Sequence, residues 1–186
     1  ILNRFPNAVQ VEAVIDNGYS TLPLADALDG DTTVRWCTQE SGNNISEGIF
    51  DLGKVVSLTE MAICFWTESS QYSDYIFDVY VSKDGVTYIP VYENARSGEV
   101  KPRTYAETFV TYLLDCEARY IKIVGHGRYR YNNSGKLPAS PNNTWFMPGE
   151  IVFLQKAVID PDGAEIHSSR LQAEAECFHK QDGASV

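Results

Sequence analysis

The stretch Tyr75–Val91, YIFDVYVSKDGVTYIPV, decides the fold class. Its first part, Tyr75–Ser82, alternates apolar side chains with polar or aromatic ones, which is the period of a half-buried β-strand. Asp84 and Gly85 then separate this run from a second strand-like run. An Asp-Gly pair in that position predicts a β-hairpin. The stretch therefore predicts two antiparallel strands joined by a tight turn.

The same period of two runs through most of the chain. We expect further strands at residues 48–54, 56–66, 104–114, 118–125 and 149–155. Gly53 is expected to close the first of them. Helical periodicity is almost absent before residue 165. Short strands separated by turn signals indicate an all-β fold, an antiparallel β-sandwich or barrel.

Two segments without this period are expected to be loops, residues 67–74 and residues 125–148. The second is rich in Asn, Gly, Pro and Ser and also contains several aromatic side chains. A loop of that length inside a compact domain is usually functional or disordered, and its aromatic content argues against simple disorder. We therefore expect a functional site there.

The charge of the chain excludes some classes of partner. Its 186 residues carry a formal net charge of −10, which disfavours nucleic acid and anionic membranes. No stretch approaches the roughly 20 apolar residues of a membrane helix. Residues 119–136 depart from this pattern, with five of the 15 basic residues and no acid. An anionic ligand would be attracted to that segment.

Cysteine usage leaves the pairing open. The chain has four cysteines without a CxxC pair, so a zinc ribbon is not expected. Three disulfide pairings are possible among Cys37, Cys64, Cys116 and Cys177. Cys64 lies in the apolar run MAICFW, where a buried free thiol is the simpler interpretation.

The composition changes after Gln155. Pro161 and Gly163 interrupt the following segment, which has the character of a linker. We place one module at residues 1–156. Residues 157–186 are interpreted as a linker, and the start of a following module within them is left open.

Five motifs in order resemble a known family. They are ALDGDTTVRW (27–36), IFDLGKVVSLTEMAICFW (49–66), FDVYVSKDGVTYIPV (77–91), ARYIKIVGHG (118–127) and WFMPGEIVF (145–153). Together they resemble the discoidin, or coagulation factor 5/8 type C, domain. Within that group they are most similar to family 32 carbohydrate-binding modules, of the kind attached to alginate lyases and other polysaccharide-degrading enzymes. The resemblance covers roughly residues 8–155.

This resemblance implies a fold and a set of partners. The fold would be a jelly-roll-like, galactose-binding-domain-like antiparallel sandwich with a glycan site on the loops at one end. The ligand would be an oligo- or polysaccharide, with a uronic-acid-containing one such as alginate as the expected target. We expect a secreted, monomeric module that is not itself an enzyme and is covalently linked to a catalytic domain.

The resemblance also implies a structural Ca²⁺ in the loop DALDGDTTV. Ca²⁺ takes six to eight oxygen ligands from carboxylates, carbonyls and hydroxyls. Carried over from the family pattern, the ligands would be Asp26, Asp29, Asp31, Val34 and Glu150. Val34 departs from the pattern, which usually has a hydroxyl there, so Thr33 is a candidate substitute. Trp36 is expected to anchor this loop to the core.

The candidate glycan site is centred on the basic segment HGRYRY. Sugar recognition requires an aromatic ring face and polar groups, and a uronate carboxylate favours arginine. The candidate ligand-binding residues are His126, Arg128, Tyr129, Arg130, Tyr131, Asn132, Tyr72, Trp66 and Trp145. In a strand-like stretch Arg128 and Arg130 would share one face, and Tyr129 and Tyr131 the other.

Two other functions use the same features. A polysaccharide lyase would use His126 or Tyr129 as base and acid, with arginine or asparagine neutralising the sugar carboxylate. A discoidin-type protein- or lipid-binding domain would present apolar loop tips, for which Leu137, Phe146 and Met147 are the candidates.

Overall fold

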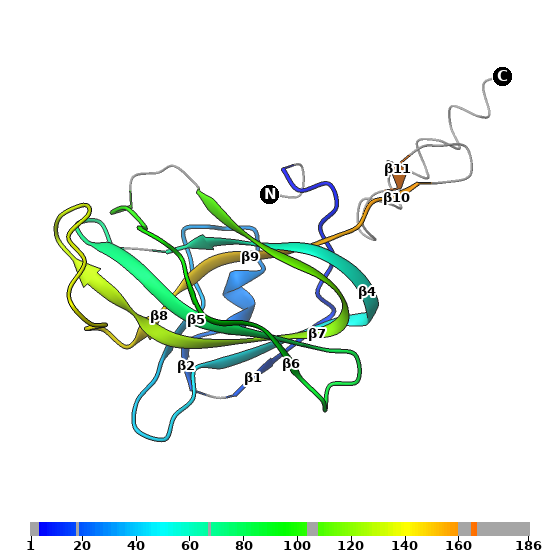
Figure 1. Cartoon of the computed structure of the whole chain (residues 1–186), viewed down its shortest axis with the longest axis horizontal. Helices are drawn as coiled ribbons and strands as arrows, with labels where there is room; N and C mark the ends of the chain where they lie inside the picture. Colours follow the sequence, from blue (N-terminus) through cyan, green and yellow to red (C-terminus); the bar gives the residue numbers. More distant parts are fainter. Residues whose placement is uncertain (1–3, 18, 67, 104–107, 160–164, 167–186) are drawn as a thin grey trace.

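The computed structural model describes residues 4–17, 19–66, 68–103, 108–159 and 165–166. Within these ranges the chain forms strands and one short 3₁₀ turn (Figure 1). The elements are β1 (Ala13–Asp16), β2 (Ser20–Leu22), η1 (Leu24–Ala27), β3 (Cys37–Gln39), β4 (Glu47–Phe65), β5 (Tyr72–Ser82), β6 (Ile89–Arg96), β7 (Phe109–Tyr131), β8 (Trp145–Phe146), β9 (Pro148–Gln155), β10 (Val158–Ile159) and β11 (Glu165–Ile166).

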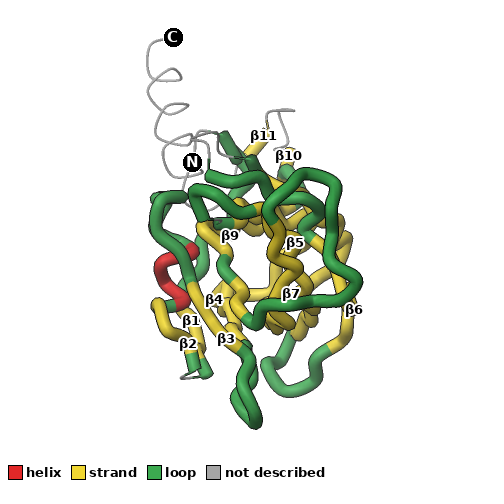
Figure 2. The backbone as a smooth tube through the Cα atoms, turned by 90° about the vertical axis from the view of Figure 1, so that its left-hand side faces the viewer, coloured by secondary structure: helices red, strands yellow, loops and turns green. Residues whose placement is uncertain are grey.

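The body is an antiparallel β-sandwich built around two long strands. The first part of β4 pairs with β1 and with the last part of β7, which continues through β5 to β6. The second part of β4 pairs with the first part of β7 and with β9. A smaller sheet has the order β2–β3–β8. Figure 2 shows the strands arranged around a central interior, with η1 on the outside. The predicted all-β sandwich is confirmed.

The two long strands each join what the sequence suggested were separate strands. Residues 48–54 and 56–66 are parts of β4, and the register with β7 shifts between Asp51 and Val56. Gly53 has φ +78° inside this irregularity, so it bends the strand instead of closing it. Asp115, with φ +43°, lies at a second register shift, between the pairs Leu58–Cys116 and Glu60–Leu113. Each long strand therefore has different neighbours before and after its irregularity, β1 and then β9 for β4, and β4 and then also β5 for β7.

The core lies between the layers and is rich in aromatic rings. Trp36, Phe50, Phe77 and Phe146 are fully buried. Trp36 contacts Phe50 and Phe146 edge-to-face, with ring centroids 6.4 and 5.6 Å apart. Burying each phenylalanine stabilises the fold by about 1.5–3 kcal/mol. The expectation that Trp36 belongs to the core is confirmed.

The predicted hairpin is present between β5 and β6. Asp84 Oδ1 accepts hydrogen bonds from the amides of Val86 and Thr87, at 2.9 and 2.8 Å. Gly85 has φ +77° and supplies the left-handed turn position. The loop expected to begin at residue 125 begins later, because β7 continues to Tyr131 alongside the start of β5. Only the shorter segment 132–144 is a loop before β8.

Other parts of the chain bear on the remaining expectations. Cys37, Cys64 and Cys116 form no disulfide with one another, and Cys177 lies outside the described residues. β10 and β11 pair antiparallel within the segment interpreted as a linker, and the segment after Ile166 also lies outside the described residues. Among the described residues, no helix is long and apolar enough to cross a membrane.

Candidate functional site

One irregularity in β7 orients the basic segment. The register with β5 shifts between Tyr75, opposite Arg128, and Phe77, opposite Gly125. Gly127 lies in this irregularity with φ +86°, and a Cβ there would meet the Asn143 carbonyl oxygen at 2.3 Å. The extra residue turns Arg128 to the inner face of the sheet, beside the buried Tyr75.

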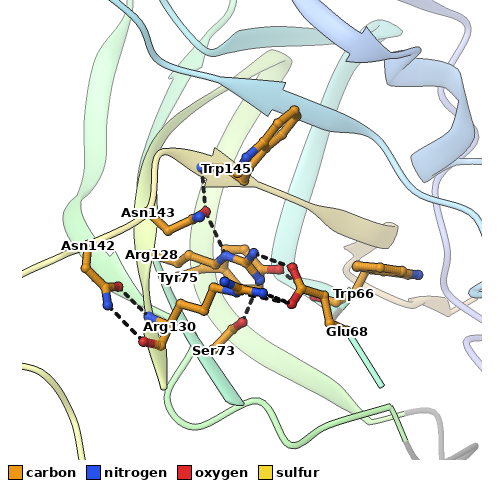
Figure 3. A network of polar contacts seen from close by, with 9 residues as sticks. All are labelled: Trp66, Glu68, Ser73, Tyr75, Arg128, Arg130, Asn142, Asn143 and Trp145. Atoms are coloured by element: carbon orange, nitrogen blue, oxygen red, sulfur yellow. Dashed lines mark hydrogen bonds and ion pairs between the residues drawn. The ribbon is translucent and has the colours of Figure 1, made fainter. Parts of the chain in front are cut away.

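Arg128 is buried, with 1% of its side chain exposed, and each of its three guanidinium nitrogens donates a hydrogen bond (Figure 3). Nε donates to Asn143 Oδ1 at 2.9 Å, and Nη1 donates to Ser73 Oγ at 2.8 Å. Nη2 donates to Glu68 Oε1 at 3.0 Å. A buried guanidinium requires this full set of partners, because an unpaired buried charge is very costly. Arg128 therefore acts as a structural anchor for three segments.

Arg130 lies beside it on the same face but reaches solvent. Its side chain is 41% exposed, and both Nε, at 3.1 Å, and Nη2 donate to Glu68 Oε2. Asn142 clamps its backbone, accepting from the Arg130 amide at 2.8 Å and donating to its carbonyl at 2.9 Å. Figure 3 shows both guanidinium groups directed at one carboxylate. We call Arg128, Arg130 and Glu68 the arginine cluster.

The arginine cluster holds the Glu68 carboxylate in its charged form. Burial raises the pKa of Glu68, but hydrogen bonds from Arg130 and Arg128 more than offset burial, so the pKa lies below its ordinary value. Sequence reasoning missed Glu68, because it belongs to a different segment from the acid-free stretch. It also missed Asn143 and Ser73, and the alternation of strand β5 was the only signal that pointed toward Ser73.

Two tryptophans are linked to residues around the arginine cluster: the Trp145 amide donates to Asn143 Oδ1 at 3.1 Å, and the Trp66 carbonyl accepts from the Tyr75 hydroxyl at 2.5 Å (Figure 3). Trp66 and Trp145 are partly buried and pack against the core. The Arg35 guanidinium carbon lies 3.7 Å from the centre of the Trp66 ring, a cation–π contact, and that of Arg103 lies 5.2 Å away. Trp66 Nε1 and Arg35 Nε are buried without a hydrogen-bond partner among the described residues. Such donors are normally satisfied by ordered water or by a ligand.

The tyrosines of the basic segment lie on the opposite face of the sheet. Tyr129 stacks under Arg96, whose guanidinium carbon is 4.3 Å from the ring centre and which forms a bidentate pair with Asp74. Tyr131 is buried and stacks on Tyr72, with ring centroids 5.6 Å apart. The expected division of arginines and tyrosines between two faces is therefore present.

His126 also lies away from the arginine cluster. Its Nε2 is 2.8 Å from Asp78 Oδ2, and its Nδ1 is 3.6 Å from Glu40 Oε2. Asp78 belongs to the outer face of β5, because the neighbouring Phe77 and Val79 are in the core. Asn132 is exposed just after β7. The structure thus brings together Arg128, Arg130, Trp66 and Trp145 and separates them from His126, Tyr129, Tyr131 and Tyr72.

The acid loop, residues 26–34, is ordered by its own polar groups. Asp29 Oδ1 accepts from the Asp31 amide at 2.8 Å. Asp31 Oδ1 accepts from the Thr33 amide at 2.9 Å and from the Thr33 hydroxyl at 2.6 Å. Asp26 lies in η1 at the start of the loop. The carbonyl oxygens of Thr32 and Val34 approach Gly149, at 3.3 and 3.4 Å from where a Cβ would lie.

Glu150 connects this acid loop to β9. Its buried carboxylate accepts a hydrogen bond from the Gly30 amide at 3.1 Å. Burial raises the pKa of Glu150 to about 8, and the charges of Asp29 and Asp31 contribute in the same direction. No three His, Cys, Asp or Glu side chains of the described residues form a metal-holding group, so backbone carbonyls would have to complete a site. A buried carboxylate beside further acids and carbonyls fits a hard cation.

Two of the three side chains expected at exposed apolar loop tips are not exposed. Phe146 and Met147 are buried in the core, because β8 and the start of β9 pack inside the sandwich. Only Leu137 is exposed, at 43%. The loops that surround the arginine cluster therefore present polar and aromatic groups in the main, not apolar spikes.

The family follows from a sequence comparison. The F5/8 type C domain model matches residues 8–139, well over half of the chain. The chain belongs to this family. The resemblance found in the five motifs is thereby confirmed, and a search of curated proteins gives no match.

Solved structures share the fold of this F5/8 type C domain. The CBM32 of AlyQ in complex with 4,5-unsaturated mannuronic acid is 22% identical, with a TM-score of 0.59, and the match covers 80% of this chain and 98% of that one. A pectin binding carbohydrate binding module is 20% identical, with a TM-score of 0.56 over 82% and 96%. CBM32-1 from a family 31 glycoside hydrolase of Clostridium perfringens is 19% identical, with a TM-score of 0.52 over 82% and 99%.

Proposed function

We propose that this domain is a non-catalytic carbohydrate-binding module that recognises a uronic-acid-containing polysaccharide, such as alginate. It would target a covalently linked polysaccharide-degrading enzyme to that glycan and raise the local substrate concentration by tethering. The observation that carries the proposal is the alignment of Arg128 and Arg130 on one carboxylate, with Trp66 and Trp145 linked to the same region through Tyr75 and Asn143. Two of the similar structures are described as a complex with an unsaturated uronic acid and as a pectin binder.

The solvent exposure of each residue indicates the role that it would have in binding. Arg130 reaches solvent and would donate hydrogen bonds to the sugar carboxylate. Arg128 is buried, so it would position Glu68 and Asn143 without touching the sugar. Trp66 and Trp145 would provide the apolar ring surface for the C–H side of the sugar. Polar groups beside aromatic rings are the usual composition of a glycan site.

The placement of the titratable groups favours binding over lyase chemistry. A lyase needs its base and its carboxylate-neutralising groups around one sugar ring. His126 and Tyr129 lie on the outer face of β7, where Asp78 and Arg96 contact them. Arg128 and Arg130 lie on the inner face. The lyase residue types found in the sequence therefore do not converge.

A Ca²⁺ ion would have a structural role in the same module. Glu150 and one of Asp29 and Asp31, together with carbonyl groups of the acid loop, would hold it, and its charge would favour the ionised form of Glu150. Asp26, Val34 and Thr33 complete the candidate ligand set. Two hydrogen bonds hold the acid loop against β9. The Gly30 amide donates to the Glu150 carboxylate, and the Trp36 amide donates to the Pro148 carbonyl at 2.9 Å.

Isothermal titration calorimetry with a glycan panel tests the function. Alginate and pectin fragments should bind, and Arg130→Ala should weaken that binding at least about tenfold, the loss of a charge-assisted contact. Lys136→Ala removes an exposed positive charge from the loop after β7 and serves as the control for a general charge effect. Binding of neutral galactosides only, unaffected by Arg130→Ala, would refute the uronate proposal.

A further inference from the structure

The Glu68 carboxylate lies where the two guanidinium groups converge. Its Oε1 accepts from Arg128 Nη2 at 3.0 Å, and its Oε2 accepts from Arg130 Nε at 3.1 Å and from Nη2. A single carboxylate thus bridges both arginines. Guanidinium groups pair in the same way with the carboxylate of a ligand as with that of a protein.

We infer that Glu68 is an internal competitor for the carboxylate of an acidic sugar, and that it sets how strongly the site discriminates acidic from neutral glycans. The inference rests on the proposed function, because it concerns the same site. It adds a specificity-determining residue that the sequence did not single out.

The charges of the arginine cluster support this role. Arg128 and Arg130 contribute two positive charges and Glu68 one negative charge, so one positive charge is in excess. A second carboxylate that approaches Arg130 meets the Glu68 carboxylate at close range. Like charges brought together in a binding site weaken binding. Neutral sugar hydroxyls, in contrast, can donate to Glu68 and accept from Arg130.

The exposure of the three side chains shows where exchange would occur. Arg128 is buried, whereas Glu68 and Arg130 are 31% and 41% exposed. The Glu68 carbonyl accepts from the Arg103 amide at 3.0 Å, which fixes the backbone on this side. A sugar carboxylate would therefore compete with Oε2 at Arg130, while the pair between Oε1 and Arg128 remains inside the protein.

The test compares Glu68→Gln with the wild-type chain. Glutamine keeps an oxygen that accepts from Arg128 but removes the negative charge. Calorimetry at pH 7 would use an alginate trisaccharide and a neutral galactoside, with thermal melting to verify that the variant is folded. We expect Glu68→Gln to bind the alginate fragment about tenfold more tightly and the galactoside no more tightly, since a like-charge repulsion has been removed.

Glu117→Gln is the matched control, because it removes the same charge from an exposed glutamate that pairs with Lys83 at 3.0 Å. It should keep wild-type affinities. If the wild type binds the alginate fragment and Glu68→Gln binds it equally or less tightly, the inference is overturned and the proposed function stands. If only Glu68→Gln binds it, the inference holds and the uronate proposal fails. If neither binds it, both are overturned.

Discussion

The arginine cluster and the acid loop are opposite in charge and differ in how that charge is neutralised. In the arginine cluster the buried guanidinium of Arg128 has a complete set of protein partners, including the Glu68 carboxylate. In the acid loop the buried carboxylate of Glu150 accepts one backbone hydrogen bond and lies near Asp29 and Asp31. Burial lifts the Glu150 pKa to about 8, whereas Glu68 titrates below its ordinary range.

The difference indicates what each region requires from outside the chain. The arginine cluster is stable as it stands, so a ligand must exchange with an internal group. In the acid loop, burial and the neighbouring acids disfavour the charged form of Glu150, and a bound cation would supply the positive charge that stabilises it. Substitution of a side chain should therefore destabilise the arginine cluster, and removal of calcium should destabilise the acid loop. The five predictions below test this contrast, in order of decreasing effect.

Arg128→Ala should cause the largest loss. The substitution removes the buried partner of Glu68, Ser73 and Asn143, and breaking a buried charged network costs about 3–5 kcal/mol of unfolding free energy. Urea denaturation followed by tryptophan fluorescence measures it. Arg130→Ala is the matched control and should cost about 1 kcal/mol or less, because its side chain is more exposed. Equal losses in the two variants would break the distinction between anchor and ligand-facing arginine.

Chelation of calcium should have the next largest effect. At a Ca²⁺ concentration of 100 times its Kd, the unfolding free energy should exceed the value in EDTA by about 2.7 kcal/mol. For a chain of this length the melting temperature would fall by roughly 5–11 °C on chelation. Differential scanning calorimetry with and without EDTA measures it.

Glu150→Gln identifies the source of that shift. The variant should lose the response to calcium, and in EDTA it should be no less stable than the wild type, because a neutral amide replaces a carboxyl whose charged form burial disfavours. An identical calcium response in the variant would remove Glu150 from the ligand set.

Acid should weaken the arginine cluster through Glu68. Because the folded-state pKa of Glu68 is lowered, its stabilising contribution is complete above the ordinary glutamate value of 4.5 and is lost as the pH falls through the folded value. The wild type should exceed Glu68→Gln by about 1 kcal/mol at pH 7, and the difference should disappear at low pH. Denaturation at pH 7, 5 and 3 measures this. If the difference in unfolding free energy between the wild type and Glu68→Gln grows as the pH falls, the stabilising role of the charged Glu68 is contradicted.

His126→Ala should have the smallest effect on glycan binding. The side chain faces Asp78 on the outer face of the sheet, so the affinity for an alginate fragment should change by less than about twofold, within the usual range for a residue outside a contact. Calorimetry measures it beside Arg130→Ala. A loss as large as that of Arg130→Ala would place the binding surface on the outer face.

The fold was largely predictable from the sequence, because alternation in Tyr75–Ser82 and the turn at Asp84 and Gly85 are local signals. The joining of segments into β4 and β7 was not, since Gly53 and Gly127 signal breaks in the sequence but form irregularities inside paired strands. The alternation correctly separated arginines from tyrosines. Glu68 escaped prediction because its pairing with Arg128 spans 60 residues and depends on the tertiary fold.

The most direct test of glycan binding at the arginine cluster is ¹⁵N NMR of the three tryptophan indoles during titration with an alginate trisaccharide. Trp36 is fully buried and donates to Ser20 Oγ at 2.8 Å, so its signal serves as an internal reference. We predict that the Trp66 and Trp145 indole signals shift in proportion to occupancy while the Trp36 signal stays in place. Saturable binding without a shift of Trp66 or Trp145 would contradict the account.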